Sequence, residues 1–287
     1  MNSGPEIVPA AVSQAASRLA AAGLDEARSE AERLLAAALD LPRHAVWTHP
    51  ERSLSAQEQA RFSELVSRRE RREPLAYILG EAEFFSLPLR VTPAVLVPRP
   101  ETERLVEVAL ELACGAKRAA EVGVGSGAIA IALARVWPEV RIWATDTSAA
   151  ALEVAAENGR RHGVSGRVTL LAGELLDPLP PDLHAMLDAV VSNPPYIRTD
   201  EFPGLEPEVR DYEPREALDG GPDGLAVIRP LIAAAPAYLR PGGLLALEVG
   251  AGQAAVMVEL MRRAGLGEVR TFRDYAGHER VVAGRVG

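Results

Sequence analysis

Beyond residue 100, short apolar segments alternate with longer segments that have helical periodicity. Strands are expected at 118–123, 140–145, 167–172, 187–192, 243–249, 267–272 and 280–285, and helices at 102–113, 126–136, 149–162, 225–239 and 252–264. This alternation predicts an α/β fold with a doubly wound, mostly parallel seven-stranded sheet that binds ligands at the carboxyl ends of its strands. The last two strands have no helix between them, so we expect them to pair antiparallel.

The first part of the chain has a different pattern, because residues 8–72 show helical spacing only. Ser55 and Glu58 form a capping box at the start of a third helix. Four arginines end this helix: Arg68, Arg69, Arg71 and Arg72. Such a run is typical of a solvated helix end, although contact with an acidic partner is an alternative. The predicted organisation is therefore a helical domain at 1–73, a linker with a hairpin at 74–100 and a larger domain at 101–287.

Composition limits the partners and the compartment. The 31 basic and 40 acidic residues give a net charge of −9, which disfavours binding to phosphate backbones. Cys114 is the only cysteine, which excludes an intramolecular disulfide, and we expect it to be a buried apolar side chain. The histidines show no ligand spacing, so no metal site is expected. Neither a basic leader nor a run of about 18 apolar residues is present, so we expect a cytoplasmic protein.

A glycine-rich turn follows the first predicted strand. Residues 121–128 read EVGVGSGA and match the dinucleotide fingerprint G-x-G-x-x-G/A at a helix N-terminus. Asp146 ends the second strand, where it can accept hydrogen bonds from ribose hydroxyls. A nicotinamide cofactor and S-adenosylmethionine both use this arrangement. The additional presence of Glu121 near the strand end and of Asn193 on a later strand favours S-adenosylmethionine, with its ribose and amino-acid ends.

The segment Asn193-Pro194-Pro195-Tyr196 follows the apolar strand 187–192. Each proline fixes its own φ, lacks an N–H and restrains the residue before it to extended geometry. The turn therefore accepts hydrogen bonds but barely donates them, and the Asn193 side-chain oxygen and the Pro194 carbonyl suit the two hydrogens of a planar NH2 group. Tyr196 could lie flat against that plane. We interpret these four residues as the catalytic and substrate-binding site, with an ordinary strand-ending turn as the alternative.

Several segments together make the chain similar to a known family. They are 74–80 (PLAYILG), 97–103 (VPRPETE), the glycine turn, 193–196 (NPPY), 213–214 (EP) and 223–225 (DGL). With these segments the chain resembles the HemK or PrmC family of protein-(glutamine-N5) methyltransferases, which modify class-1 peptide-chain release factors. The resemblance covers nearly the whole length and implies a class I S-adenosylmethionine-dependent methyltransferase domain at 101–287, with a Rossmann-like sheet.

The resemblance also implies roles for individual residues. S-adenosylmethionine would be held by Gly123, Val124, Gly125, Ser126, Gly127 and Asp146, with Asn193 between cofactor and substrate. The acid of the first strand, usually Asp, is here Glu121. Relatives often have Asp-Trp near the adenine after the third strand, whereas this chain has Glu174 and Leu175, so a leucine would cover the ring.

The expected function is methyl transfer from S-adenosylmethionine to the side-chain amide nitrogen (N5) of the glutamine in the Gly-Gly-Gln motif of a release factor. The helical domain 1–73 is expected to recognise this protein partner, because the cofactor motifs all lie beyond the linker. One alternative is an N6-adenine methyltransferase on DNA or RNA, which the net acidity and the lack of a basic recognition domain disfavour. Another is a non-catalytic protein that docks on the translation machinery. A nicotinamide oxidoreductase would need a hydride-handling site, and none is recognisable.

Two further segments have less distinctive patterns. The acidic stretch 201–213 is expected to be a solvated loop, with a lid over the substrate as the alternative. Arg99 and Glu103 open the larger domain, where they could shape the substrate entrance or form a structural ion pair.

Overall fold

The computed structural model describes residues 7–287, so the first six residues of the predicted 1–73 domain lie outside the described part. Two compact units divide the chain, and neither is continuous in sequence. The first comprises the described residues up to Gly80 together with Glu206–Tyr212, and the second comprises Glu81–Leu205 and Glu213–Gly287. The hairpin of the predicted linker therefore belongs to the second unit, and seven residues from the later part of the chain belong to the first.

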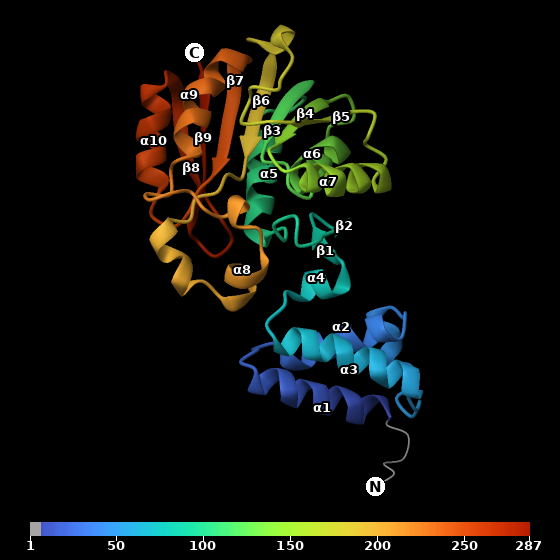
Figure 1. Cartoon of the computed structure of the whole chain (residues 1–287). Helices are drawn as coiled ribbons and strands as arrows, with labels where there is room; N and C mark the ends of the chain where they lie inside the picture. Colours follow the sequence, from blue (N-terminus) through green and yellow to red (C-terminus); the bar gives the residue numbers. More distant parts are fainter. Residues whose placement is uncertain (1–6) are drawn as a thin grey trace. The chain divides into compact units, whose positions relative to one another are not determined.

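The first unit is helical (Figure 1). Its helices are α1 (Val8–Ala21), α2 (Ala27–Ala38), α3 (Ala56–Glu70), the short α4 (Leu75–Leu79) and α8 (Pro207–Tyr212), with a 3-10 turn at Arg43–Trp47. Leucines at helical spacing, among them Leu19, Leu34 and Leu35, are completely buried between the helices. The predicted capping box at the start of α3 is confirmed, because the Ser55 hydroxyl accepts from the Glu58 N–H and the Glu58 carboxylate accepts from the Ser55 N–H.

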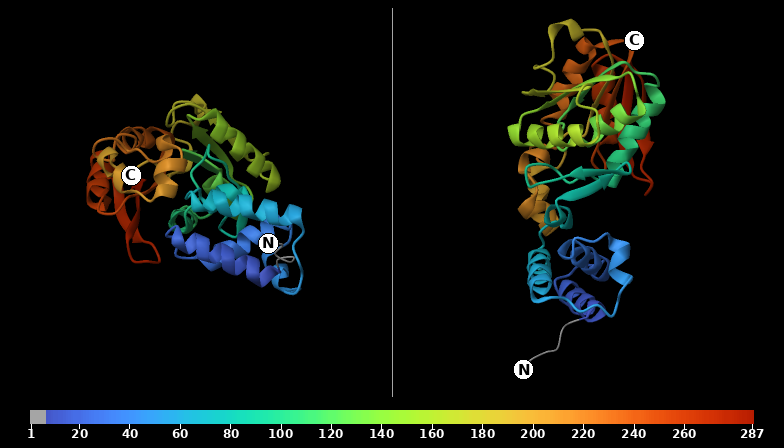
Figure 2. Two further views of the ribbon diagram at one scale, coloured as in Figure 1. Left: turned by 60° about the horizontal axis from the view of Figure 1, so that its bottom comes forward. Right: turned by 90° about the vertical axis from the view of Figure 1, so that its right-hand side faces the viewer.

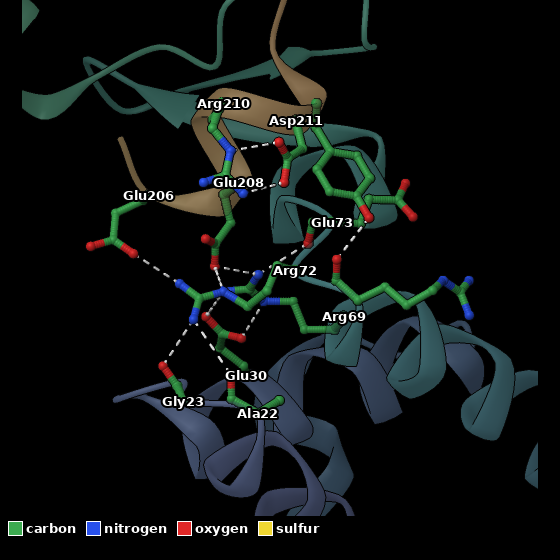
Figure 3. A network of polar contacts seen from close by, with 12 residues as sticks. Ala22, Gly23, Glu30, Arg69, Arg72, Glu73, Glu206, Glu208, Arg210 and Asp211 are labelled. Atoms are coloured by element: carbon green, nitrogen blue, oxygen red, sulfur yellow. Dashed lines mark hydrogen bonds and ion pairs between the residues drawn. The ribbon is translucent and has the colours of Figure 1, made fainter. Parts of the chain in front are cut away.

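The C-terminal turn of α3 binds the inserted segment 206–212 through ion pairs (Figure 3). Arg69 is only 6% exposed, and it donates to Glu30 from Nε at 2.6 Å and to Glu208 from Nη1 at 2.9 Å. Arg72 donates to Glu208 at 2.7 Å and to Glu206 at 3.0 Å. Arg69 in the last turn of α3 and Arg72 just beyond the helix thus pair with carboxylates of a segment that is more than 130 positions away in sequence.

These contacts correct two expectations. The prediction of a solvated helix end was wrong for Arg69 and Arg72. The prediction of a solvated loop was wrong for Glu208 and Glu213, which are largely buried, whereas Glu206 is exposed. The acidic partner, which had been the alternative, is part of the same chain. Local sequence pattern does not reveal such pairs, since the two partners are more than 130 positions apart in sequence.

The second unit contains the expected seven-stranded sheet, in the order β5-β4-β3-β6-β7-β9-β8 (Figure 1). Its strands are β3 (Arg118–Val122), β4 (Arg141–Asp146), β5 (Val168–Ala172), β6 (Leu187–Ser192), β7 (Leu239–Glu248), β8 (Leu266–Arg273) and β9 (Glu279–Val286). Strands β3 to β7 are parallel, whereas β9 is antiparallel to both β7 and β8. The predicted doubly wound α/β fold with an antiparallel end is confirmed. β7 begins at Leu239 and not at residue 243 as predicted, and its pairing with β6 shifts register between Leu187 and Ala189.

Helices cover both faces of this sheet. They are α5 (Pro100–Leu112), α6 (Ala128–Val136), α7 (Ala149–Arg161), α9 (Ile228–Tyr238) and α10 (Ala254–Arg263). Successive strand residues point to opposite faces. In β6, Ala189 and Val191 pack with α5, α6 and α7, whereas Val190 packs with α9 and α10. The central strands are therefore apolar on both faces, as buried parallel strands are.

A small hairpin precedes the sheet and is attached to it by polar contacts. It consists of β1 (Glu81–Phe84) and β2 (Leu87–Arg90), and the right view of Figure 2 shows it (teal) next to α7 (green). Asn158 of α7 is completely buried, and it accepts from the Arg90 N–H at 2.8 Å. Its Nδ2 donates to the carbonyls of Arg90 and Ser126, both at 2.9 Å. One side chain thus joins the hairpin, α7 and the glycine turn.

Cys114, which we expected to be buried, is exposed. α5 ends at Leu112, and the cysteine lies in the turn between this helix and β3. Among residues 7–287, the structure contains no helix with the length and apolar character required to cross a bilayer.

Candidate active site

The carboxyl ends of β3 and β6 lie side by side in the middle of the sheet. β4 and β5 extend from β3 in one direction, and β7 extends from β6 in the other, so the winding reverses between these two strands. Loops that leave a parallel sheet at such a reversal diverge and leave space for a ligand. The glycine turn follows β3 and Asn193 follows β6, so the fold brings the two predicted sites together.

A cavity of about 610 Å³ lies at this reversal, entirely within the second unit. Its lining includes these predicted site residues: Glu121, Gly123, Val124, Gly125, Ser126, Asp146, Glu174, Leu175, Asn193 and Pro195. Three other predicted residues, Gly127, Pro194 and Tyr196, do not line it. The volume is in the range of pockets that enclose a nucleoside-sized ligand.

The three glycines of the turn serve two purposes. Gly123, Gly125 and Gly127 have φ values of 75°, 52° and 84°, in the region that favours glycine. A Cβ added to Gly123 or Gly125 would meet no protein atom within 4 Å, so the space beside them is left to the cavity. A Cβ added to Gly127 would lie 3.0 Å from Ile131 Cδ1 and 3.4 Å from Ala155, so this glycine lets α6 approach α7.

Two carboxyl groups hold the turn. Asp146 accepts from the backbone N–H of Gly125 with Oδ2 and from that of Ser148 with Oδ1, both at 2.9 Å. Glu121 is 1% exposed and accepts from the Ala130 N–H, in the first turn of α6, at 2.8 Å. Burial raises the pKa of Glu121 well above its ordinary value, against the effect of that hydrogen bond, and the charge of Asp146 raises it further.

The residues predicted to lie near an adenine follow β5. Glu174 is exposed, Leu175 is half-buried, and both line the cavity. Leu175 has a φ of 49°, which costs a residue other than glycine about 1 to 3 kcal/mol. Its carbonyl accepts from the Thr145 hydroxyl at 2.6 Å, and this contact holds the backbone in place. Strain of this kind is common at ligand-binding positions.

Asn193 lies between the end of β6 and the first turn of α5. Its Nδ2 donates to Thr102 Oγ1 at 3.1 Å, and its side chain has no other hydrogen bond within residues 7–287. Oδ1 is therefore free to accept from a ligand. Pro195 also lines the cavity, whereas Pro194 is buried.

Tyr196 is held firmly behind the turn. Its hydroxyl donates to Glu248 Oε1 at 3.3 Å, and its carbonyl accepts from Gln253 Nε2 at 2.9 Å. A Cβ on Gly250 would lie 3.0 Å from the tyrosine ring, and one on Gly224 would lie 2.5 Å from the tyrosine carbonyl oxygen. Burial raises the pKa of Tyr196 above its ordinary value, and the charge of Glu248 adds to this. The phenol is therefore a neutral hydrogen-bond donor, and its stacking on a substrate stays a prediction.

Arg99 and Glu213 form an ion pair beside the cavity. Arg99 Nη2 lies 2.7 Å from both carboxylate oxygens of Glu213, whose side chain is 1% exposed. Burial raises the pKa of Glu213, and the charge of Arg99 opposes this. The pair ties the start of α5 to the position where the chain re-enters the second unit. Glu103 does not line the cavity, and its carboxylate accepts from the Phe85 N–H at 2.7 Å.

Comparison with known proteins agrees with this arrangement. The family model described as "PrmC N-terminal domain" matches residues 10–80, and "Methyltransferase small domain" matches residues 102–202. A release factor glutamine methyltransferase of Geobacter sulfurreducens is 46% identical over 269 residues, which cover 94% of this chain and 93% of the relative. Another, of Moorella thermoacetica, is 47% identical over 273 residues, with coverage of 94% and 95%.

The chain belongs to the release factor glutamine methyltransferase family. A solved structure that is more distant in sequence has a similar fold. The solved structure of a methyltransferase from Pyrococcus furiosus matches with a TM-score of 0.53 at 21% identity, over 71% of this chain and 90% of that chain. This likeness concerns the fold alone.

The sequence patterns did not reveal three buried polar residues that support the site in this family member: Thr102, Asn158 and Glu248. Thr102 lies in the quoted segment 97–103, but nothing local showed that it faces Asn193. Glu248 is the last residue of β7, and an acid at the carboxyl end of an apolar strand could have been recognised as a candidate. Asn158 gave only the weak signal of a polar residue on an apolar helix face.

Proposed function

We propose that this protein transfers a methyl group from S-adenosylmethionine to the side-chain amide nitrogen (N5) of the glutamine in the Gly-Gly-Gln motif of a class-1 peptide-chain release factor. One observation gives this proposal its main support. Asn193 lines the cavity next to the glycine turn, with Nδ2 engaged by Thr102 and Oδ1 left free. An acceptor in that position suits the N–H of a planar amide.

The residues present fit S-adenosylmethionine. The open glycines and Asp146 suit a ribose at the turn, Glu121 suits a positively charged amino-acid end, and Leu175 offers an apolar surface for the adenine. We propose that Val124, Ser126, Gly127 and Glu174 complete this site, either as lining or by shaping the turn. When bound, the cofactor supplies an electrophilic methyl group on a sulfonium.

The protein's contribution to the chemistry is mainly one of position. An amide nitrogen is a weak nucleophile, because its lone pair is delocalised into the carbonyl. Asn193 Oδ1 and the Pro194 carbonyl would each accept one N–H, which draws electron density toward nitrogen and holds its face in line for attack. The methylated nitrogen then carries a surplus proton and is strongly acidic, so it can release this proton to water or to a carbonyl. No strong base is required.

The partner follows from the family and from the charge. Relatives at 46% and 47% identity are release factor glutamine methyltransferases, and the net charge of −9 disfavours DNA or RNA as the substrate. We infer that the helical unit recognises the release factor, because every residue that lines the cavity lies in the second unit. Such a reaction belongs to the cytoplasm, where release factors work.

The experiment is a methylation assay with purified release factor, duplex DNA and labelled S-adenosylmethionine. We expect one methyl group on the glutamine of the Gly-Gly-Gln loop, located by peptide mapping. A release factor with glutamate at this position has no N–H donors and should accept no methyl group. Asparagine keeps the donors but withdraws the nitrogen by a methylene, and it should also fail. Label on a lysine, on the N-terminus or on adenine would contradict the proposal, as would tighter calorimetric binding of NAD than of S-adenosylmethionine.

A further inference from the structure

Glu248 is a buried carboxyl group that the proposed mechanism has not used. It ends β7, is 1% exposed, and accepts from the Tyr196 hydroxyl with Oε1. Its Oε2 is completely buried and has no hydrogen-bond partner within residues 7–287. A half-satisfied carboxyl group in the interior is costly, so its retention beside the site calls for a reason.

Thr102 connects this carboxyl group to Asn193. Its Oγ1 accepts from Asn193 Nδ2 at 3.1 Å, and the same hydroxyl favours the charged form of the Glu248 carboxyl group and so lowers its pKa. Thr102 is 4% exposed, so water has little access to this hydroxyl. The three side chains come from the first turn of α5, the end of β6 and the end of β7.

The direction of the hydrogen bonds follows from the chemistry of the three groups. A threonine hydroxyl has a single proton, and an ionised carboxylate can only accept. If Thr102 donates to Glu248, it must accept from Asn193, and the Asn193 amide is then oriented with Nδ2 toward Thr102 and Oδ1 toward the cavity. Without the carboxylate, the hydroxyl could donate to Oδ1 and turn the amide over, which would present a donor to the substrate.

We propose that Glu248, acting through the Thr102 hydroxyl, is a positioning residue that keeps the Asn193 side-chain oxygen directed at the substrate amide. This inference rests on the proposed function for its catalytic consequence. The orientation of Asn193 itself is a property of the protein alone, and it can be measured without any methyl transfer.

The surroundings of Glu248 make this orientation sensitive to pH. Burial raises the pKa of Glu248 to about 7, while Thr102, Arg280 of β9 and Tyr196 oppose the shift and Glu101 of α5 adds to it. Arg280 also pairs with Asp274, which limits the positive charge available to Glu248. Once protonated, the carboxyl group can donate to Thr102, and the constraint on Asn193 is lost. The active orientation is thus complete above this pKa and disappears below it.

Nuclear magnetic resonance tests the orientation directly. The side-chain amide signal of Asn193, assigned by its absence from Asn193→Ala, should titrate with a midpoint near pH 7 in the wild type. This titration should be missing in Glu248→Gln and in Thr102→Val. A wild-type signal that does not titrate, or one that titrates equally in both variants, would overturn the proposal.

Kinetics at saturating release factor and cofactor test the consequence. Thr102→Val should lower kcat about tenfold or more, Thr102→Ser should restore it to within about threefold of the wild type, and the cofactor Kd should change little in either. Glu248→Gln should lose the acid limb of the kcat profile. The double variant Thr102→Val/Glu248→Gln should be no slower than Thr102→Val alone, because the two residues act in one chain of contacts. Thr271→Val on β8 makes the same chemical change outside the site and should leave kcat unchanged.

The two experiments separate the two proposals. A wild-type protein that shows the Asn193 titration but does not methylate release factor would refute the proposed function and leave the positioning role standing. Normal methylation with full kcat in Thr102→Val, or with an unchanged acid limb in Glu248→Gln, would refute the positioning role alone. Thermal unfolding of each variant serves as the check on folding. If Glu248→Gln fails to fold, the comparison of Thr102→Val with Thr102→Ser still decides the matter.

Discussion

At the scale of single residues, a substitution of Asn193 gives the most direct test of the proposed chemistry. Replacing it with alanine removes the free Oδ1 acceptor and leaves Thr102 and the glycine turn in place. We expect Asn193→Ala to lower kcat by about 100-fold, on the scale of one lost positioning or electrostatic contact. The Kd for S-adenosylmethionine, measured by calorimetry, should change by less than about threefold. Near-normal turnover would show that another group accepts the substrate N–H.

Glu121 illustrates a conflict between stability and function. Because burial raises its pKa in the folded protein, folding takes up a proton between the unfolded and folded pKa values, and stability falls as pH rises through that range. Glutamine can still accept from the Ala130 N–H and carries no charge. We expect Glu121→Gln to raise the Tm of the cofactor-free protein at about pH 8 and to lose this advantage near about pH 4, below the ordinary pKa of a glutamate, where the carboxyl group is largely protonated in both states.

Scanning fluorimetry at the two pH values measures this effect. Glu111→Gln changes an exposed glutamate at the end of α5 and is the matched control, with no change in Tm expected. A lower Tm for Glu121→Gln at the higher pH would mean that the buried charge is stabilised by more than the single hydrogen bond described above.

At the scale of elements, the contact between α3 and α8 depends on few side chains. Replacing Arg69 with methionine would leave the Glu208 carboxylate partly buried and short of a partner, and its Oε2 already has no partner among residues 7–287 of the native protein. We expect Arg69→Met to destabilise the first unit by about 3 kcal/mol, as expected when one member of a buried ion pair is removed. The measurement is denaturant unfolding combined with hydrogen exchange of residues 206–212.

Two comparisons make this experiment specific. Arg71→Met removes an exposed arginine from the same helix end and should change stability by less than about 0.5 kcal/mol. The double variant Arg69→Met/Glu208→Gln should recover part of the loss, because both charges are then absent. Faster exchange of residues 206–212 in Arg71→Met than in Arg69→Met would contradict the assignment.

The elements also mark the limit of what sequence could predict. Strands and helices of the second unit were predicted within a few residues, since hydrophobic periodicity is a local property. The glycine turn and Asn193 were recognisable because the neighbouring glycines and prolines in the sequence determine the backbone conformation there. Two other features could not be predicted from the sequence: the Arg69–Glu208 contact and the effect of Thr102 on Glu248. Each joins side chains that only the tertiary fold brings together. The exposure of Cys114 had no local signal either.

At the scale of the whole molecule, the division of labour between the units can be tested by removing one. A shortened chain of residues 81–287 keeps every residue that lines the cavity. We expect it to bind S-adenosylmethionine with a Kd within about fivefold of the full chain. Its kcat/KM on intact release factor should fall about 100-fold or more, a loss of roughly 3 kcal/mol in transition-state binding. Methylation at the full-length rate would show that the helical unit has no part in recognition.

The insertion of residues 206–212 into the first unit affects how the protein is made and how it can be recombined. During synthesis the helices up to Gly80 leave the ribosome well before Glu208 exists, so Arg69 can pair with Glu30 but not with Glu208 while the following 125 or so residues are added. The first unit is complete only when most of the second has been translated, so the two units cannot fold strictly one after the other. For the same reason, a chimera between relatives that is joined once near residue 80 would separate Arg69 and Arg72 from the carboxylates they evolved with. An exchange that preserves both units must transfer the N-terminal segment and residues 206–212 together.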